Sequence, residues 1–211
     1  MIASSSLAVF VTAALGLLVL PGPAVLYIVT RSAAQGRRAG LASVLGIELG
    51  SLCHAVAAAF GLSAILVASA LAFSVVKYAG AAYLIYLGIR ALLGRHDAST
   101  EDDAPPRSFS ELFRKGLLVN LLNPKTALFF YAFLPQFVDP HRGPPIVQTL
   151  ILGGIFVLMA TCTDSTYALL GSGVGRLVTR RPGFPRLQRY VSAGIYMALG
   201  VAAAISGEGR K

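Results

Sequence analysis

Three ionisable side chains lie inside long apolar stretches of the sequence: Glu48, Lys125 and Asp164. Ionised groups deep in a membrane are costly, and they usually face a bundle interior, one another or a path for water. Lys125 could hold a carboxylate, whereas Glu48 and Asp164 could hold an ammonium group or a coupling proton. Together they would suit a zwitterion such as an amino acid. If either carboxylate pairs with Lys125, part of its role is structural.

Proline interrupts two of the apolar stretches near their middles, at Pro21-Gly22-Pro23 and at Asn123-Pro124-Lys125. Such a break frees backbone polar groups, so it persists only where it is buried in protein or lines a wet cavity. Half-helix N-termini there could present N–H groups to a carboxylate. A simple kink is the alternative reading. Matched breaks in two halves of a chain favour the substrate site of a transporter.

The composition indicates an integral membrane protein. The chain is 55% hydrophobic and 13% charged, with a mean hydropathy of +0.71, whereas soluble domains carry roughly 25% charged residues. The net charge of +9 would suggest nucleic acid in a soluble chain, but the basic residues lie in short loops between apolar stretches. We therefore expect a lipid bilayer, and no nucleic acid, as partner.

Motifs of enzymes are not evident in the sequence, which shows no His-Glu-x-x-His pair, Gly-x-Ser-x-Gly elbow or phosphate-binding loop. Cys53 and Cys162 lie in apolar stretches without the spacing of a metal site or a disulfide framework. We predict no enzyme activity, no metal and no cofactor. Transport would then draw its energy from an ion gradient.

Six transmembrane helices are expected, because a span needs about 20 mostly apolar residues. We place them at 6–30, 39–68, 71–93, 112–137, 146–170 and 187–205. Most basic residues follow the first, third and fifth spans, and Arg31, Arg37 and Arg38 form the first of these groups. The positive-inside rule puts these loops in the cytoplasm, which places both termini outside.

An internal repeat is visible in the third and sixth spans, where 77–88 aligns without gaps on 189–200. The first and fourth spans share Gly-Leu-Leu-Val, at 16–19 and 116–119, shortly before each break. Three spans per half is an odd number, so the second half must enter the membrane from the opposite side. The expected fold is an all-α membrane protein of two inverted three-helix repeats, 1–93 and 112–211, joined by a cytoplasmic linker at 94–111.

The second span has two distinct faces. Glu48 shares one face with Ser51 and other small residues, which suits a cavity, and Gly46, Gly50 and His54 lie on the opposite face. Small residues allow another helix to come close. We interpret His54 as a structural histidine rather than a proton carrier. In the fifth span, the polar run at 161–166 could form a hydrogen-bond network with neighbouring helices.

At these motifs the chain resembles the LysE/RhtB family of bacterial amino-acid exporters over nearly its whole length. The motifs are Pro21-Gly22-Pro23, the Gly-Arg-Arg-Ala-Gly run at 36–40, the run at 80–88, Asn120 with Asn123-Pro124-Lys125, and Phe-Leu-Pro-Gln-Phe-Val at 133–138. The resemblance implies an inner-membrane secondary transporter that exports amino acids or close derivatives, with proton antiport, and a homodimer. Exported compounds differ among members, so the resemblance does not identify the side chain of the substrate.

The residues and the resemblance together give one expected site. Substrate-binding residues are expected at Pro21, Gly22, Pro23, Asn120, Asn123, Pro124 and Lys125, with Glu48 and Asp164 for proton coupling or for the ammonium. Two alternatives stay open: a metal-cation transporter of the same fold, and a membrane subunit that does not transport. Lys125 argues against a dedicated divalent site, which needs more oxygen ligands.

Overall fold

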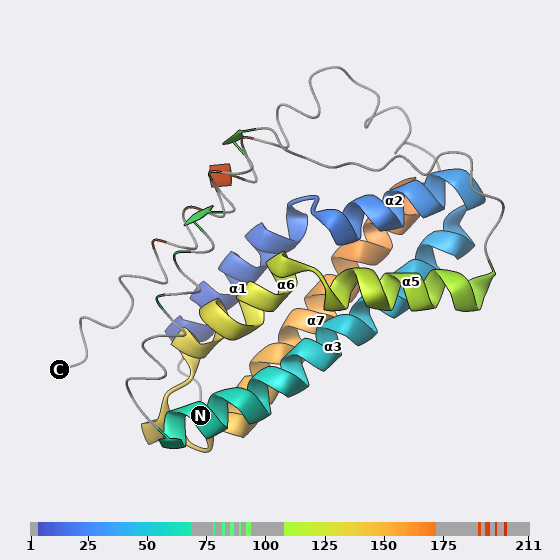
Figure 1. Ribbon diagram of the computed structural model, residues 1–211. Coiled ribbons are helices and arrows are strands. Elements are labelled where there is room, and N and C mark those ends of the chain that lie inside the picture. The colour runs from blue at the N-terminus through green and yellow to red at the C-terminus, as the bar shows by residue number, and fades with distance from the viewer. Residues whose placement is uncertain are drawn as a thin grey trace.

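The computed structural model describes residues 4–68 and 108–171, together with isolated positions between 78 and 93 and between 190 and 201. Apart from those isolated positions, the expected third and sixth spans lie outside the described residues, as does most of the expected linker. Every regular element in the described ranges is helical. The inverted repeat of six helices therefore stays a prediction, although four of its elements can be followed in Figure 1.

The first expected span is a broken helix. It consists of α1 (Ser4–Val19) and α2 (Pro23–Gln35), which are bent by 48° relative to each other. Pro21 and Pro23 lack the N–H that would continue the α1 hydrogen-bond ladder, so α1 ends before them. Pro23 then opens α2, where its missing N–H costs nothing.

The fourth expected span is broken in the same way. It contains α5 (Phe109–Leu121) and α6 (Pro124–Leu128), with a bend of 51° at the break. The chain continues through a π-helical turn, η1 (Phe129–Phe133), into a 3₁₀ turn, η2 (Leu134–Phe137). The two broken helices run in opposite directions in Figure 1, α1 to α2 from left to right and α5 to α6 from right to left.

Two long helices support the broken ones. They are α3 (Arg37–Ala68) and α7 (Pro145–Leu170), and both are long and apolar enough to cross a membrane. Each broken pair also passes that test as one span, which gives two to four candidate spans within the described ranges. The elements agree with four of the expected spans to within a few residues, and α5 begins at Phe109 rather than at 112.

Glycine brings α3 and α5 into close contact, as the small-residue face of α3 predicts. A Cβ on Gly46 would overlap the carbonyl oxygen of Phe113, and a Cβ on Gly50 would lie 2.9 Å from the Cβ of Asn120. On the other side of the contact, a Cβ on Gly116 would lie 2.6 Å from the carbonyl oxygen of Ser43. The crossing depends on these three glycines, because no side chain fits between the backbones.

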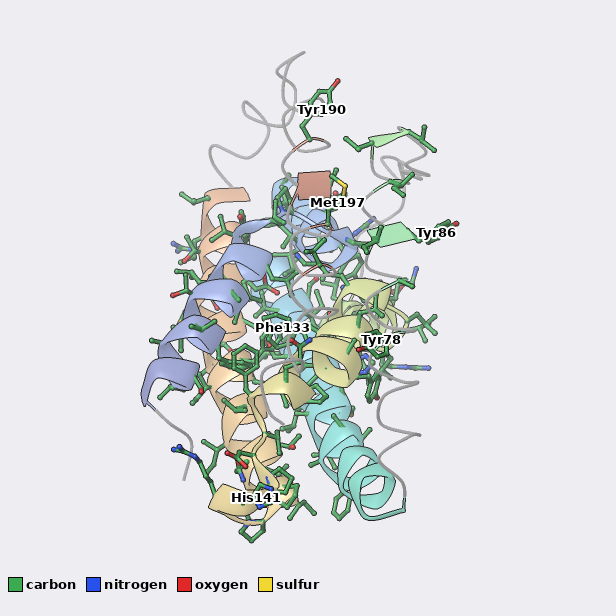
Figure 2. All side chains as sticks on the ribbon, turned by 90° about the vertical axis from the view of Figure 1, so that its left-hand side faces the viewer. Tyr78, Tyr86, Phe133, His141, Tyr190 and Met197 are labelled. Carbon is green, nitrogen blue, oxygen red and sulfur yellow. The ribbon has the colours of Figure 1, made fainter. Side chains whose placement is uncertain are left out.

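Aromatic side chains fill the core between α1, η1 and α7. Phe10, Phe129, Phe130 and Phe156 are all buried, and the ring centroids of Phe129 and Phe156 lie 4.3 Å apart. Figure 2 labels Phe133, which lies between the ribbons of α1 and α6 and belongs to the same cluster. This cluster fixes the segment after the second break against the two neighbouring helices.

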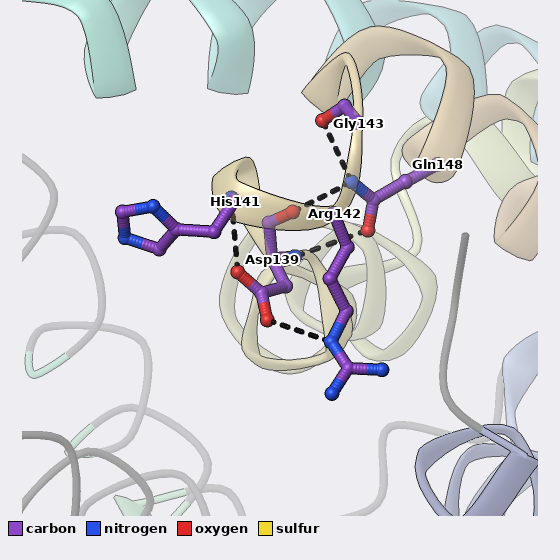
Figure 3. Close-up of polar contacts among 5 residues, drawn as sticks. All are labelled: Asp139, His141, Arg142, Gly143 and Gln148. Atoms are coloured by element: carbon purple, nitrogen blue, oxygen red, sulfur yellow. Dashed lines mark hydrogen bonds and ion pairs between the residues drawn. The ribbon is translucent and has the colours of Figure 1, made fainter.

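The turn between η2 and α7 is held by Gln148 (Figure 3). The side chain of Gln148 accepts a hydrogen bond of 3.0 Å from the N–H of Asp139 and donates to the carbonyl oxygens of Asp139 and Gly143 at 2.8 and 2.9 Å. Asp139 also pairs with Arg142 at 3.3 Å within the short helix η3 (Pro140–Arg142). Gln148 is buried, so its hydrogen bonds hold the turn from inside the protein.

Arg31 corrects one expectation from the sequence. It was expected in a cytoplasmic loop, but it lies in α2 and is buried, with its guanidinium 5.8 Å from the centre of the Tyr27 ring. The loop is absent because α2 continues to Gln35 and α3 begins at Arg37. Gly36 alone joins them at a positive φ of 84°, which favours glycine.

Candidate functional site at the two helix breaks

The two helix breaks meet at Lys125. Its Nζ donates a hydrogen bond of 2.7 Å to the carbonyl oxygen of Leu20, the residue that follows α1. A Cβ on Gly22 would lie 3.1 Å from the Cδ of Lys125, so glycine leaves room for the lysine side chain. Lys125 is buried, and its ammonium therefore stands inside the protein at the point where both helices are interrupted.

A cavity of about 30 Å³ surrounds this point. Glu48 from α3, Lys125 from α6 and Asp164 from α7 all line it, so the structure brings together the three ionisable residues singled out in the sequence. The other lining residues are Leu17, Leu18, Gly22, Ala24, Val25, Ile47, Ser51, Asn120, Asn123, Thr126, Phe156 and Ala160. In this conformation the space would take water molecules but not an amino acid.

The charged groups of the cavity interact with one another. Asp164 lies close enough to both Lys125 and Glu48 for electrostatic interaction. Neither carboxyl oxygen of Glu48 makes a hydrogen bond of good geometry within the described part of the chain, although Ser51 and Asp164 are near it. Two neighbouring carboxylates repel each other, so a proton or an organic cation beside them would relieve that repulsion.

Asn120 organises the polar wall of the cavity. Its Nδ2 donates to the carbonyl oxygen of Ile47 at 2.6 Å and to the hydroxyl of Ser51 at 2.8 Å. Its Oδ1 accepts from the hydroxyl of Thr126 at 2.8 Å and from the amide of Asn123 at 3.5 Å. The Asn120 side chain is thus fully engaged, and it ties α3 to both sides of the second break.

Asn123 acts as the cap of α6. Its Oδ1 accepts a hydrogen bond of 3.1 Å from the backbone N–H of Lys125, which satisfies one of the free donors at the start of the helix. At the first break, Gly22 precedes α2 without any side-chain cap. Gly22, Ala24 and Val25 line the cavity. The N-terminus of α2, which has no side-chain cap, therefore lies at the cavity.

Two prolines of the expected site, Pro21 and Pro23, are not among the residues that line the cavity, and Pro23 is exposed. They shape the site through the backbone, by ending α1 and opening α2. Pro124 opens α6 in the same way.

Sequence reasoning gave no role in the site to Thr126, and to Ser51 only a place beside Glu48. Thr126 follows Asn120 by six residues across the break, a spacing that does not correspond to one helical face. Its partnership with Asn120 therefore depends on the bend, which the sequence does not specify. Ser51 lies one helical turn after Glu48, on the face expected to suit a cavity, and it does line the cavity.

Within the polar run on α7, the threonine hydroxyls bond to their own helix, and Asp164 alone faces the charged groups of neighbouring helices. The hydroxyls of Thr161, Thr163 and Thr166 donate to carbonyl oxygens about one turn earlier in the same helix. Within the run only Asp164 is buried. Among the described residues, no group of three or more His, Cys, Asp and Glu side chains comes together to hold a metal ion.

Comparison with known proteins identifies related chains. The family described as LysE type translocator matches residues 15–207. A protein of Vibrio cholerae named "Uncharacterized membrane protein" is 32% identical over 181 residues, which cover 86% of this chain and 87% of the relative. No solved structure matches the chain.

Two further relatives carry functional names. The homoserine/homoserine lactone efflux protein of Salmonella typhimurium is 35% identical over 154 residues, 73% of this chain and 74% of that protein. The leucine efflux protein of Klebsiella pneumoniae is 29% identical over 181 residues, 84% of each chain. The family match covers nearly the whole chain, and the apolar helices fit membrane spans. The chain therefore belongs to the LysE type translocator family.

Proposed function

We propose that this protein is a secondary transporter that exports amino acids or close derivatives from the cytoplasm by proton antiport. The observation that carries the proposal is the meeting of two broken helices at a buried lysine, beside two buried carboxyl groups. The efflux relatives, named for homoserine, homoserine lactone and leucine, support the class of substrate. A bacterial inner membrane is the proposed location.

The substrate carboxylate is proposed to bind at Lys125 and at the N-terminus of α2. The first N–H groups of a helix have no partner within it, and the positive end of the helix dipole favours an anion. The uncapped start of α2 lines the same cavity as the Lys125 ammonium. An incoming carboxylate would replace the carbonyl oxygen of Leu20 as the acceptor for Lys125, a stronger charge-assisted bond.

The substrate ammonium and the coupling proton are proposed to share the pair of carboxyl groups. Glu48 and Asp164 come from α3 and α7, on the same cavity as Lys125. When the substrate is bound, its ammonium lies beside the carboxylates, and after release a proton takes its place. Competition between the two for one pair of groups would couple outward movement of substrate to inward movement of protons.

Alternating access would follow from rocking one three-helix repeat against the other. The cavity of about 30 Å³ must enlarge to admit a substrate, so the conformation described here corresponds to a closed step of the cycle. The basic loops are proposed to face the cytoplasm and both termini the outside. A homodimer is an additional expectation from the family resemblance.

The experiment that tests the proposal is efflux from proteoliposomes preloaded with a mixture of labelled amino acids, with and without an imposed proton gradient. Gradient-dependent release of one or a few compounds supports the exporter and names its substrate. Protein-free liposomes and a proton ionophore are the controls. No release from folded, inserted protein would overturn the proposal, and a metal-dependent shift in stability would then favour a cation transporter.

A further inference from the structure

At each helix break, proline takes the normal donor away from a backbone carbonyl at the end of the preceding helix. In an α-helix the carbonyl of residue i−4 accepts from the N–H of residue i, and proline has no N–H. Pro23 therefore cannot serve the carbonyl of Val19 at the end of α1. Pro124 likewise cannot serve the carbonyl of Asn120 at the end of α5, which accepts instead from the N–H of Asn123 at 3.0 Å. Inside a membrane protein the carbonyl of Val19 needs a donor from elsewhere, and the carbonyl of Asn120, with two lone pairs, can take a second one.

Tyr167 supplies the donor at the first break. Its hydroxyl donates a hydrogen bond of 2.6 Å to the carbonyl oxygen of Val19. The ring of Tyr167 packs against the apolar cluster to which α2 contributes Ala24 and Ile28. One side chain of α7 therefore contacts the end of α1 and the cluster that includes the start of α2, so it holds the bend from both sides.

His54 supplies a second donor at the second break. Its Nε2 lies 3.1 Å from the carbonyl oxygen of Asn120, and because a carbonyl only accepts, this nitrogen carries the hydrogen. In the neutral ring Nδ1 then accepts from the hydroxyl of Tyr131 at 3.3 Å. The imidazole also stacks on Phe130, with centroids 6.2 Å apart and planes 13° from parallel.

The contacts of His54 also lie on both sides of its break. Asn120 belongs to α5, before the break, and Phe130 and Tyr131 belong to η1, after it. The two clamps are therefore built alike, each with one side-chain donor to the carbonyl that proline cannot serve and one ring packed beyond the bend. They are also exchanged between the halves of the chain, since α3 clamps the break of α5–α6 and α7 clamps the break of α1–α2.

We propose that Tyr167 and His54 are positioning residues of the transport site, each fixing the break in the opposite half of the chain. They hold the breaks at the angle at which Lys125 reaches Leu20 and the charged groups share one cavity. The inference rests on the proposed function, because that cavity is taken as the transport site. Neither residue contacts substrate in this role.

Hydrogen–deuterium exchange of the full-length protein tests the clamps without reference to transport. Tyr167→Phe removes only the hydroxyl, and we expect exchange at 19–26 to rise about threefold to tenfold while 120–127 is unchanged, because one hydrogen bond at the first break is lost. His54→Phe keeps a flat ring and removes both nitrogens, and it should produce the converse pattern. Uniform change over the whole protein, or no change at either break, would overturn the proposal.

Matched variants separate the clamps from general packing. Tyr27→Phe removes the hydroxyl of a different tyrosine, on α2, which donates to the carbonyl of Leu112 at 3.2 Å. This variant should leave exchange at 19–26 as in wild type. Tyr131→Phe leaves the bond from His54 to Asn120 in place and should have little effect at 120–127. His54→Gln offers an amide donor where Nε2 stood and should restore protection there. Failure of this rescue would show that the ring alone matters.

Transport kinetics test the positioning role itself. With the labelled amino acid that wild type releases fastest from a mixture, Tyr167→Phe and His54→Phe should raise KM about threefold to tenfold, and His54→Gln should stay near wild type. If hydrogen–deuterium exchange shows the two opposite patterns but KM is unchanged in both variants, the role in transport is overturned. If wild type releases no amino acid, the proposed function fails and the positioning role with it. The hydrogen–deuterium exchange experiment still tests the clamps independently.

Discussion

The ammonium of Lys125 donates a 2.7 Å hydrogen bond to the carbonyl oxygen of Leu20, across 105 positions of sequence. The lysine belongs to the first turn of α6 and the leucine directly follows α1, so this bond joins the interruptions of two different helices. The buried ammonium of Lys125 thus marks the point where the two interrupted helices meet. The proposed transport chemistry starts from this contact.

Asp164→Asn should abolish proton-coupled efflux and leave the protein folded. The amide keeps the size of the side chain but cannot take up or release the coupling proton, and it removes the charge that faces Lys125. Efflux from proteoliposomes with and without a proton gradient measures the effect. Cys162→Ser, at an exposed neighbouring position, is the control. Wild-type rates and gradient dependence in the asparagine variant would rule out a coupling role for Asp164.

Gly46→Ala should destabilise the protein strongly. The new Cβ would overlap the carbonyl oxygen of Phe113, so α3 and α5 would have to move apart, at a cost of about 1–3 kcal/mol or more. Gly154→Ala on α7 is the matched control, because nothing lies within 4 Å of its Cβ, and it should be neutral or slightly stabilising. Thermal unfolding in detergent compares them. Equal melting temperatures would refute the close crossing of α3 and α5.

Gln148→Leu should loosen the turn before α7. The substitution keeps the size of a buried side chain and removes the three hydrogen bonds to Asp139 and Gly143 shown in Figure 3. We expect a loss of roughly 1–3 kcal/mol in stability, seen as a lower melting temperature and faster amide exchange at 138–144. Val147→Ala, at an exposed neighbouring position, should change neither quantity. An unaltered turn in the leucine variant would show that Gln148 does not hold it.

Much of the helical layout could be predicted from the sequence, because long apolar runs and proline interruptions act locally. The break at Pro21 to Pro23 and the break at Asn123 to Lys125 both lie where the residues indicate. One local signal was missed. Ser108 caps α5, accepting from the N–H of Glu111 at 3.3 Å, and a serine followed three residues later by glutamate is typical of a helix start. This capping signal places the start of α5 at Phe109 rather than at 112.

The arrangement of the candidate site could be predicted only in part. Burial cost indicated that Glu48, Lys125 and Asp164 belong in a polar interior, but their meeting depends on the packing of α3, α6 and α7 against one another. The partners of His54 and Tyr167 were not predictable either. They bond backbone carbonyls at breaks 66 and 148 positions away, and residue types alone do not specify such distant contacts.

The contact between Lys125 and a substrate carboxylate is the central claim, and a binding cycle tests it most directly. Equilibrium binding of the exported amino acid and of its carboxamide would be measured for wild type and for Lys125→Gln in detergent. We expect wild type to prefer the acid about tenfold to hundredfold, as a charge-assisted bond of roughly 1.5–3 kcal/mol implies, and the variant to lose most of that preference, keeping only what the N-terminus of α2 supplies. A variant that keeps the wild-type preference would show that Lys125 does not hold the carboxylate.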